Sequence, residues 1–245
     1  MKKIVGSMLL VASTTFVVAD EVKVAEDTNV TVTKKASKVE SLDNQRAFNT
    51  ALKLGTLGVG LDVSTPINDK LSARFNLNGA SYTDTDTQDD NDYEGTLDLL
   101  TAGVLLDYYP FENNFRLSGG AYYNGNGFKG NIKPSATTSI DINGKEYNVG
   151  DIGSLDSELS FDKVAPYVGL GWGNDAHDKG WGFTFDLGVM YHGKGEATLT
   201  PKDVSPLVDR AELDRNVKNE EQDINDDLSD YKFYPVVALG VNYSF

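Results

Sequence analysis

The sequence contains no cysteine and only two histidines, His177 and His192. Disulfide frameworks, thiolate zinc sites and cysteine nucleophiles are therefore excluded, and a histidine-rich metal site is disfavoured. Basic residues are scarce as well, because 22 Lys and Arg stand against 37 Asp and Glu, for a net charge of −15. So acidic a chain lacks the basic surface that nucleic acids require, and we expect no nucleic-acid partner. After residue 20 no apolar run approaches the roughly 18 residues of a membrane-spanning helix.

The first residues have the pattern of a processing signal. Lys2 and Lys3 precede a mostly apolar stretch from Ile4 to Val18, and Val17 and Ala19 are small residues suited to a cleavage site. This pattern predicts a secretory signal peptide over residues 1–19. An N-terminal membrane anchor is the alternative. Residues 20–45 are polar and are predicted to form a flexible periplasmic extension.

From Ala51 onward, apolar and polar or small residues alternate with a period of two, which predicts β-strands. The apolar rows contain no charged residue, whereas a soluble β-sandwich would show a polar outer face. The predicted strands cover residues 57–63, 71–77, 100–106, 115–123, 164–172, 181–191 and 231–245. The apolar residues occupy even-numbered positions up to Leu54 and odd-numbered positions from Leu57 onward. This change of parity predicts a tight turn at Gly55-Thr56 and an eighth strand over 46–54. A β-bulge at this point is the alternative.

The connections between these strands alternate in length. Those at 66–70, 111–114 and 175–180 are short, and those at 83–93, 130–156 and 201–229 are long. Short turns at one end and long loops at the other are typical of outer-membrane barrels. The chain ends in Phe245, the aromatic residue that such barrels present to their assembly machinery. Residues 46–245 are thus predicted to be all-β, an eight-stranded antiparallel up-and-down transmembrane β-barrel with long extracellular loops. It would lie in the outer membrane of a Gram-negative bacterium with both termini periplasmic.

Several stretches resemble a family of small proteobacterial outer-membrane β-barrel proteins. They are LKLGTLGVGLDVSTPINDK (52–70), FDKVAPYVGLGWGN (161–174), GWGFTFDLGVMYHGKGEATLT (180–200) and YPVVALGVNYSF (234–245). More distantly, the chain is similar to the carbapenem-susceptibility porin type implicated in uptake of ornithine and basic amino acids. The features shared with that type are IDINGKEY (140–147), Ala165-Pro166-Tyr167 before a Gly-rich strand, and residues 191–200. The resemblance implies the barrel fold and an outer-membrane location, and it transfers no set of ligand-binding residues.

Ionisable and aromatic residues on the polar rows are predicted to line the lumen. They are Lys53, Asp62, Arg74, Asp107, Arg116, Tyr122, Lys163, Tyr167, Asp186 and Lys232. The interior of an eight-stranded barrel is just wide enough for side chains. Two interpretations stay open: a solid, charge-paired lumen that only stabilises the barrel, or a constricted, charge-lined path for small polar solutes.

The long connections carry three further signals. An acidic extracellular loop contains Asp84, Asp86, Asp89, Asp90, Asp92 and Glu94. Its spacing departs from a calcium loop, because Asp89 replaces the glycine and Gly95 the bidentate glutamate, so a solvated acidic loop is favoured. In the last loop, Ser205 as cap and Pro206 as first residue predict a helix over 205–227, with an apolar stripe formed by Leu207, Ala211, Leu213, Val217 and Ile224. Asn143-Gly144 predicts a hairpin turn.

These observations predict a narrow outer-membrane channel for small polar, cationic or zwitterionic solutes such as basic amino acids. The alternative is a non-conducting structural or surface-interaction barrel that binds lipopolysaccharide, divalent cations or partners through its loops. No Ser, His and acid set converges on one rim, so we expect no catalytic residues and no enzyme. No cofactor or metal site is predicted. The expected partners are outer-membrane lipids and lipopolysaccharide, the barrel assembly machinery through Phe245, and small cationic solutes.

Overall fold

The computed structural model of this chain describes residues 48–88, 91–111, 113–133, 139–173 and 179–245. The predicted signal peptide over 1–19 and the predicted extension over 20–45 lie outside these residues.

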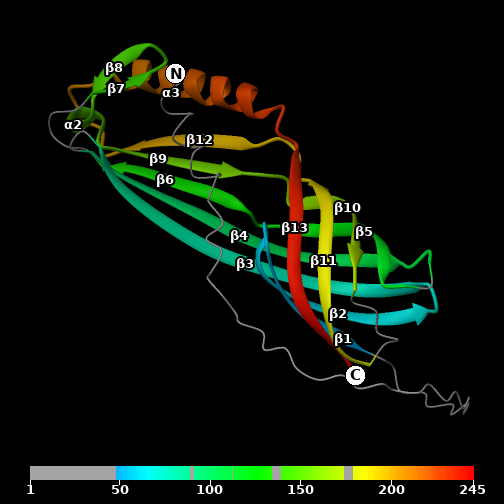
Figure 1. The fold of residues 1–245 in the computed structure, drawn as a ribbon. Helices are drawn as coiled ribbons and strands as arrows, with labels where there is room; N and C mark the ends of the chain where they lie inside the picture. The colour runs from blue at the N-terminus through cyan, green and yellow to red at the C-terminus, as the bar shows by residue number, and fades with distance from the viewer. Residues whose placement is uncertain (1–47, 89–90, 112, 134–138, 174–178) are drawn as a thin grey trace, which may run out of the picture. The chain divides into compact units, whose positions relative to one another are not determined.

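Within the described residues, eight antiparallel strands close into a barrel. Each strand pairs with the next, and the last pairs with the first (Figure 1). In order around the barrel they are β1 (Asn49–Gly55), β2 (Gly58–Asn68), β3 (Leu71–Gln88), β4 (Asn91–Tyr108), β5 (Phe115–Asn124), β10 (Val164–Trp172), β11 (Gly180–Tyr191) and β13 (Phe233–Ser244). Gly55 pairs with Gly58 across a turn at Thr56-Leu57, so the predicted turn is present but one residue later than predicted, and the β-bulge alternative is wrong.

The alternation seen in the sequence separates two environments. Val104 is 67% exposed on the outside of β4, whereas its neighbour Leu105 is 1% exposed in the lumen. The same holds around the barrel, since Phe75 and Phe183 face outward while Asn76 is buried. Successive side chains of a strand point to opposite faces, so one apolar row covers the outside and one polar or small row fills the inside.

At the barrel end that carries the β1–β2 turn, opposite the end where Asn49 pairs with Ser244, part of the barrel continues as an open sheet. We call it the extension sheet. It consists of the far halves of β3 and β4, followed by β6 (Gly127–Lys133), β9 (Ser154–Ser160) and β12 (Glu196–Lys202), paired in that order. Short breaks at 125–126, 161–163 and 192–195 separate β6, β9 and β12 from the barrel strands β5, β10 and β11 that they continue. In Figure 1 these strands run side by side away from the barrel.

The prediction that residues 83–93 form a loop is wrong. β3 and β4 stay paired from Leu71 and Tyr108 up to Gln88 and Asn91. Alternating threonines explain this result, because β-branched residues favour extended backbone and the aspartates between them are compatible with an exposed strand. Residues 89 and 90 lie outside the described part of the chain.

A hairpin and a helix pack next to β12. The hairpin consists of β7 (Ser139–Ile142) and β8 (Lys145–Asn148), with the predicted turn confirmed by positive φ angles of 53° at Asn143 and 77° at Gly144. The short α2 (Val149–Ile152) follows, and α3 (Arg210–Leu228) precedes β13.

The helix predicted over 205–227 is present but begins later, at Arg210. Asp209 is its cap, because its carboxylate accepts the N–H groups of Ala211 and Glu212. Of the predicted apolar stripe, Leu213, Val217 and Ile224 are buried, whereas Leu207 and Ala211 are exposed. None of the described helices is long and apolar enough to cross a membrane.

Candidate functional site

Six charged side chains meet in the lumen, each from a different strand of the barrel. We call them the lumen cluster. They are Lys53, Asp62, Arg74, Asp107, Arg116 and Asp186, and all six are buried. Three are basic and three are acidic, so the cluster is neutral when every group is ionised. Buried charges of this kind are tolerated only when they are paired and hydrogen-bonded.

Arg74 lies at the centre of the lumen cluster. Its Nη2 donates to Asp107 Oδ1 at 2.9 Å, and its Nε forms an ion pair with Asp107 Oδ2 at 2.8 Å. Its Nη1 lies 3.1 Å from Asp62 Oδ2 and 3.2 Å from Asp186 Oδ1. Ser118 Oγ adds a 2.5 Å hydrogen bond to Asp107 Oδ1. One guanidinium thus binds three carboxylates that lie on three different strands.

Lys53 and Arg116 complete the connection across the lumen. Lys53 Nζ lies 2.5 Å from Asp62 Oδ2 and 2.9 Å from Asp186 Oδ2. Arg116 Nη2 lies 2.7 Å from Asp186 Oδ1, and its Nη1 donates to the carbonyl of Gly173. The ion pairs therefore link side chains from six of the eight barrel strands.

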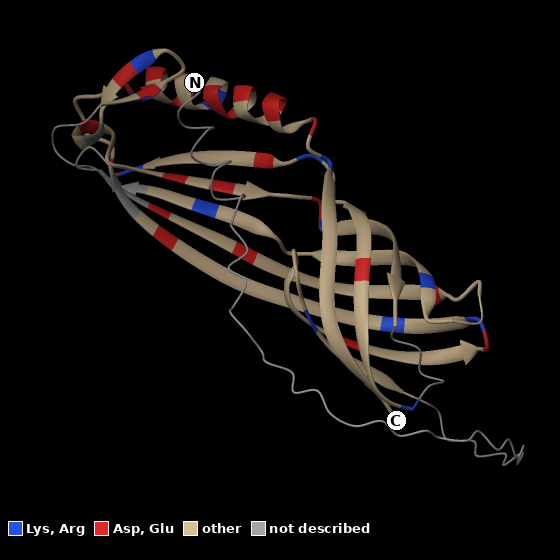
Figure 2. Ribbon diagram, in the orientation of Figure 1, with Lys and Arg blue, Asp and Glu red and all other residues tan. Residues whose placement is uncertain are grey.

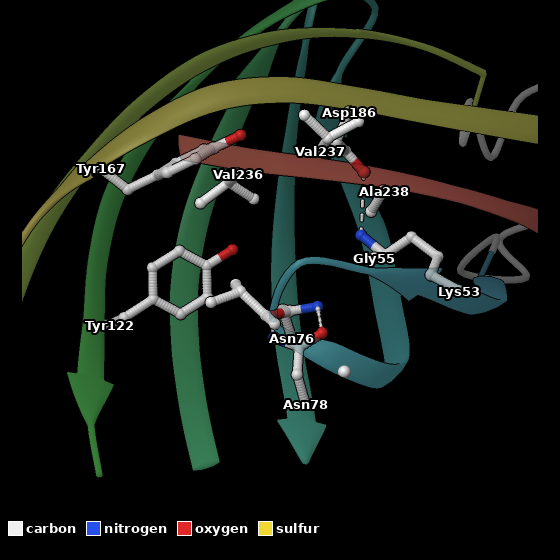
Figure 3. A pocket seen from close by; sticks show the side chains of 12 residues that line it. Lys53, Gly55, Asn76, Asn78, Tyr122, Tyr167, Asp186, Val236, Val237 and Ala238 are labelled. Atoms are coloured by element: carbon white, nitrogen blue, oxygen red, sulfur yellow. Dashed lines mark hydrogen bonds and ion pairs between the residues drawn. The ribbon is translucent and has the colours of Figure 1, made fainter. Parts of the chain in front are cut away.

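An apolar and aromatic layer covers the lumen cluster on the side of the extension sheet. It comprises Leu57, Leu105, Tyr122, Ala165, Tyr167, Met190 and Val236. The rings of Tyr122 and Tyr167 meet edge to face, with centroids 5.4 Å apart, and Figure 3 shows both reaching into the lumen. The cavity that they share with Lys53 and Asp186 has a volume of about 10 Å³, the room of roughly one water molecule.

Two of the predicted lumen residues lie outside this arrangement. Lys163 is exposed just before β10, and Lys232 is half-buried just before β13. Their carbonyls accept hydrogen bonds from the backbones of Asn124 and His192 where the strands bend. Side chains alternate between the lumen and the outside only within a continuous strand. Both lysines precede a strand, so their odd or even position could not predict which way they face.

Sequence reasoning missed the amide side chains beside the lumen cluster. Asn76 donates to Asp62 Oδ1, and Asn78 donates to Thr101 Oγ1 at 2.8 Å. Both share the parity of Arg74 in β3, which was the available signal. Because the prediction considered ionisable and aromatic residues only, these neutral donors were not selected.

The extension sheet carries a second feature, a groove of about 440 Å³ that crosses β4, β6, β9 and β12. We call it the polar groove. Threonine hydroxyls line it together with Glu94, Lys129, Asn131, Asp156, Glu158 and Lys202. Its volume lies within the range of small-molecule sites, but its lining is polar and charged instead of apolar.

Opposite charges are paired at one end of the polar groove. Lys202 forms an ion pair with Asp156, which also accepts a hydrogen bond from Asn131. The bond from Lys202 lowers the pKa of the Asp156 carboxyl and raises the pKa of the lysine. Lys129 and Glu158 are exposed and stand opposite each other in register. The groove therefore offers hydroxyl, amide, ammonium and carboxylate groups.

The predicted acidic loop is divided between two strands. Asp84 is exposed on β3, and Glu94 lies in the polar groove on β4. Asp86 and Asp92 lie within β3 and β4, where only their backbone is described, while Asp89 and Asp90 lie outside the described residues. In the part of the chain that the structure describes, no three His, Cys, Asp or Glu side chains group as metal ligands.

The segment 140–147, one of the three features that carry the resemblance to the porin type, belongs to the hairpin that contacts α3. The backbone N–H of Asn143 donates to Glu220 Oε2 at 2.9 Å, and Lys145 Nζ lies 2.5 Å from Glu212 Oε2. This last bond raises the pKa of Lys145. Hairpin and helix thus form one cap beside β12.

Comparison with known proteins identifies the fold. No family model matches the chain, and no curated protein matches it in sequence. The crystal structure of CarO2 from Acinetobacter baumannii is 22% identical, with a TM-score of 0.54, over 82% of this chain and 99% of that one. CarO from the same organism is 21% identical, with a TM-score of 0.51, over 80% of this chain and 97% of that one. The predicted fold class is confirmed, as is the distant similarity to the CarO porin type at the level of the fold.

Proposed function

We propose that this protein is a non-conducting outer-membrane barrel that presents the extension sheet and its cap as an interaction surface. The lumen supports this proposal most directly, because the lumen cluster connects six of the eight strands and the cavity beside Lys53 and Asp186 is about 10 Å³. A path for even a small solute would require Arg74 to leave three carboxylates at once. The function would then reside in the part of the chain beyond the barrel.

The outer surface of the barrel supports the membrane location. Large apolar side chains are exposed on every barrel strand, among them Leu52, Leu61, Phe75, Val104, Leu117, Val168, Phe183 and Leu239. Such a surface is stable against hydrocarbon and would aggregate in water. β1 begins at Asn49 and β13 ends at Ser244. These two residues pair with each other at the barrel end opposite the extension sheet. With both termini periplasmic, the extension sheet faces the outside of the cell.

The polar groove supports contact with lipopolysaccharide. On β4 the outward row changes from Leu100 to Asp98, Thr96 and Glu94. At about 3.3 Å per residue, Thr96 lies about 13 Å along the strand from the last apolar side chain. The groove then borders the sugars and phosphates of the neighbouring lipids. Lys129 and Lys202 suit phosphate groups, and the carboxylates suit bridging divalent cations.

The test is a conductance measurement on the purified, folded barrel in a planar bilayer under a salt gradient. We expect the native protein to show no discrete current steps. The control is the double variant Arg116→Ala with Asp107→Ala, which removes one charge of each sign from the lumen cluster. Because it empties part of the lumen without a net charge change, it should conduct.

Discrete, cation-selective steps in the native barrel would overturn the proposal. They would favour the channel predicted from the sequence, and uptake of ornithine, lysine and arginine into liposomes would then be measured. In that case neutralising Asp107 and Asp186 should change the cation selectivity, since both carboxylates line the only route through the closed strands that are described here.

A further inference from the structure

The two edges of the extension sheet differ. β2 pairs with β3 only from Leu71 to Gly79, because the β1–β2 hairpin turns back at Thr56-Leu57. Beyond that point, β3 from Ala80 to Gln88 pairs with β4 on one side. Among the described residues, no strand pairs with its other side. This segment, which we call the free edge, spans nine residues or about 30 Å of extended backbone.

The opposite edge of the same sheet is covered. There the backbone N–H groups of Ala197 and Leu199 in β12 donate to the side chains of Asn225 and Glu221 in α3, at 2.7 and 2.6 Å. Asn225 also donates back to the carbonyl of Ala197 at 3.3 Å. Two helix side chains thus take the place of a neighbouring strand. An unpaired strand edge binds further strands readily, and natural proteins usually block it in some such way.

The free edge has few of the usual blocking features. It contains no proline and no lysine, and its register with β4 runs without a shift to Gln88. The hydroxyl groups of Ser81 and Thr83 are bonded to β4, at 2.7 Å to Asp98 and 3.0 Å to Thr96. On the other face, Tyr82 and Asp84 are exposed. The backbone edge and this row are therefore available together.

We propose that the free edge of β3 is a docking site for an extended segment of another protein that carries Lys or Arg at alternate positions. The added strand would donate and accept main-chain hydrogen bonds, and its basic row would face the row of β3 that carries the exposed Asp84. A strand that presents acidic residues in that row is repelled. The proposal rests on the function proposed above only in that the edge must face outside the cell.

Charge also argues against a second copy of this chain as the occupant. Pairing two free edges antiparallel about a twofold axis would place aspartates of one copy opposite or diagonal to aspartates of the other. Like charges directly opposite on paired strands are destabilising. The chain has a net charge of −15, which adds repulsion between copies.

The experiment measures binding of a nine-residue peptide of alternating Lys and Thr to the full-length protein in detergent micelles, by fluorescence anisotropy. Two further peptides serve as probes: one with Glu in place of Lys, and one with Lys kept but alternate backbone nitrogens methylated. We expect saturable binding of the Lys peptide alone. Asp84→Lys should weaken it at least tenfold and should allow the Glu peptide to bind.

Glu158→Lys is the matched control, because it makes the same charge change at an exposed site on β9 away from the free edge. Equal weakening by Glu158→Lys, or equal binding of the methylated peptide, would overturn the proposal in favour of general charge attraction. Concentration-dependent dimerisation that Asp84→Lys changes would identify a second copy as the occupant and overturn it too. The Lys peptide could instead bind the purified protein but bind cells only after they are permeabilised. That result would support the docking site and refute the outward orientation of the extension sheet.

Discussion

Inward-facing glycines make room for the large side chains that fill the lumen. A Cβ added at Gly188 would lie 2.5 Å from the hydroxyl oxygen of Tyr167, and one added at Gly103 would lie 2.4 Å from the ring of Tyr122. Real Cβ contacts are not this short, so each tyrosine needs a glycine on the neighbouring strand. The glycines of the polar rows are therefore part of the packing.

Gly188→Ala should lower the free energy of unfolding by about 1–3 kcal/mol, because Tyr167 must move within a filled interior. Denaturant titration of the barrel in detergent measures this. Gly119→Ala is the control, since an added Cβ there meets nothing within 4 Å. A change at Gly188 no larger than that at Gly119 would show that Tyr167 has free space.

Arg116→Met should lower the free energy of unfolding by more than Gly188→Ala does. It leaves three buried carboxylates with two basic partners, and removal of one member of a buried ionic network typically costs about 3–5 kcal/mol. The same titration measures the loss, with Lys163→Met, at an exposed position, expected within about 0.5 kcal/mol of the native protein. A loss below about 1 kcal/mol for Arg116→Met would mean that water reaches Asp186.

At the level of elements, α3 protects the edge of β12 through side chains. Asn225→Ala removes one donor and one acceptor from that edge, so the amide of Ala197 should exchange with solvent deuterium roughly two- to tenfold faster. Exchange measured by mass spectrometry or NMR checks this. Asp226→Ala, at the next and exposed position, should leave the exchange unchanged, and unchanged exchange in Asn225→Ala as well would contradict the capping role.

The elements show where local sequence was sufficient. The parity change before Leu57 predicted the first turn, and Asn143-Gly144 predicted the hairpin, because each depends on its own few residues. The start of α3 was placed too early, since Ser205 and Pro206 also form a start signal. Asp209 is the N-cap instead of Ser205, because its carboxylate accepts hydrogen bonds from two helix N–H groups.

For the whole molecule, alternation and the alternating lengths of the connections predicted the closed barrel of eight strands. The extension sheet was not predicted, because it depends on pairing between β4 and β6 and between β9 and β12, which lie far apart in the chain. The six residues of the lumen cluster were selected by parity, but their mutual contacts depend on the stagger of the strands. Figure 2 shows the outcome, with few charged positions along the closed strands and many on α3.

The position of Arg74 has a consequence for how the barrel is made. Its carboxylate partners come from β2, β4 and β11, which the chain supplies at Asp62, Asp107 and Asp186. Until β11 has joined, the guanidinium and its neighbours would be open to hydrocarbon if the sheet were already inserted. Insertion ahead of closure would therefore carry a large desolvation penalty. We therefore expect the cylinder to close before or during insertion, and the cluster would then set the order of these steps of biogenesis.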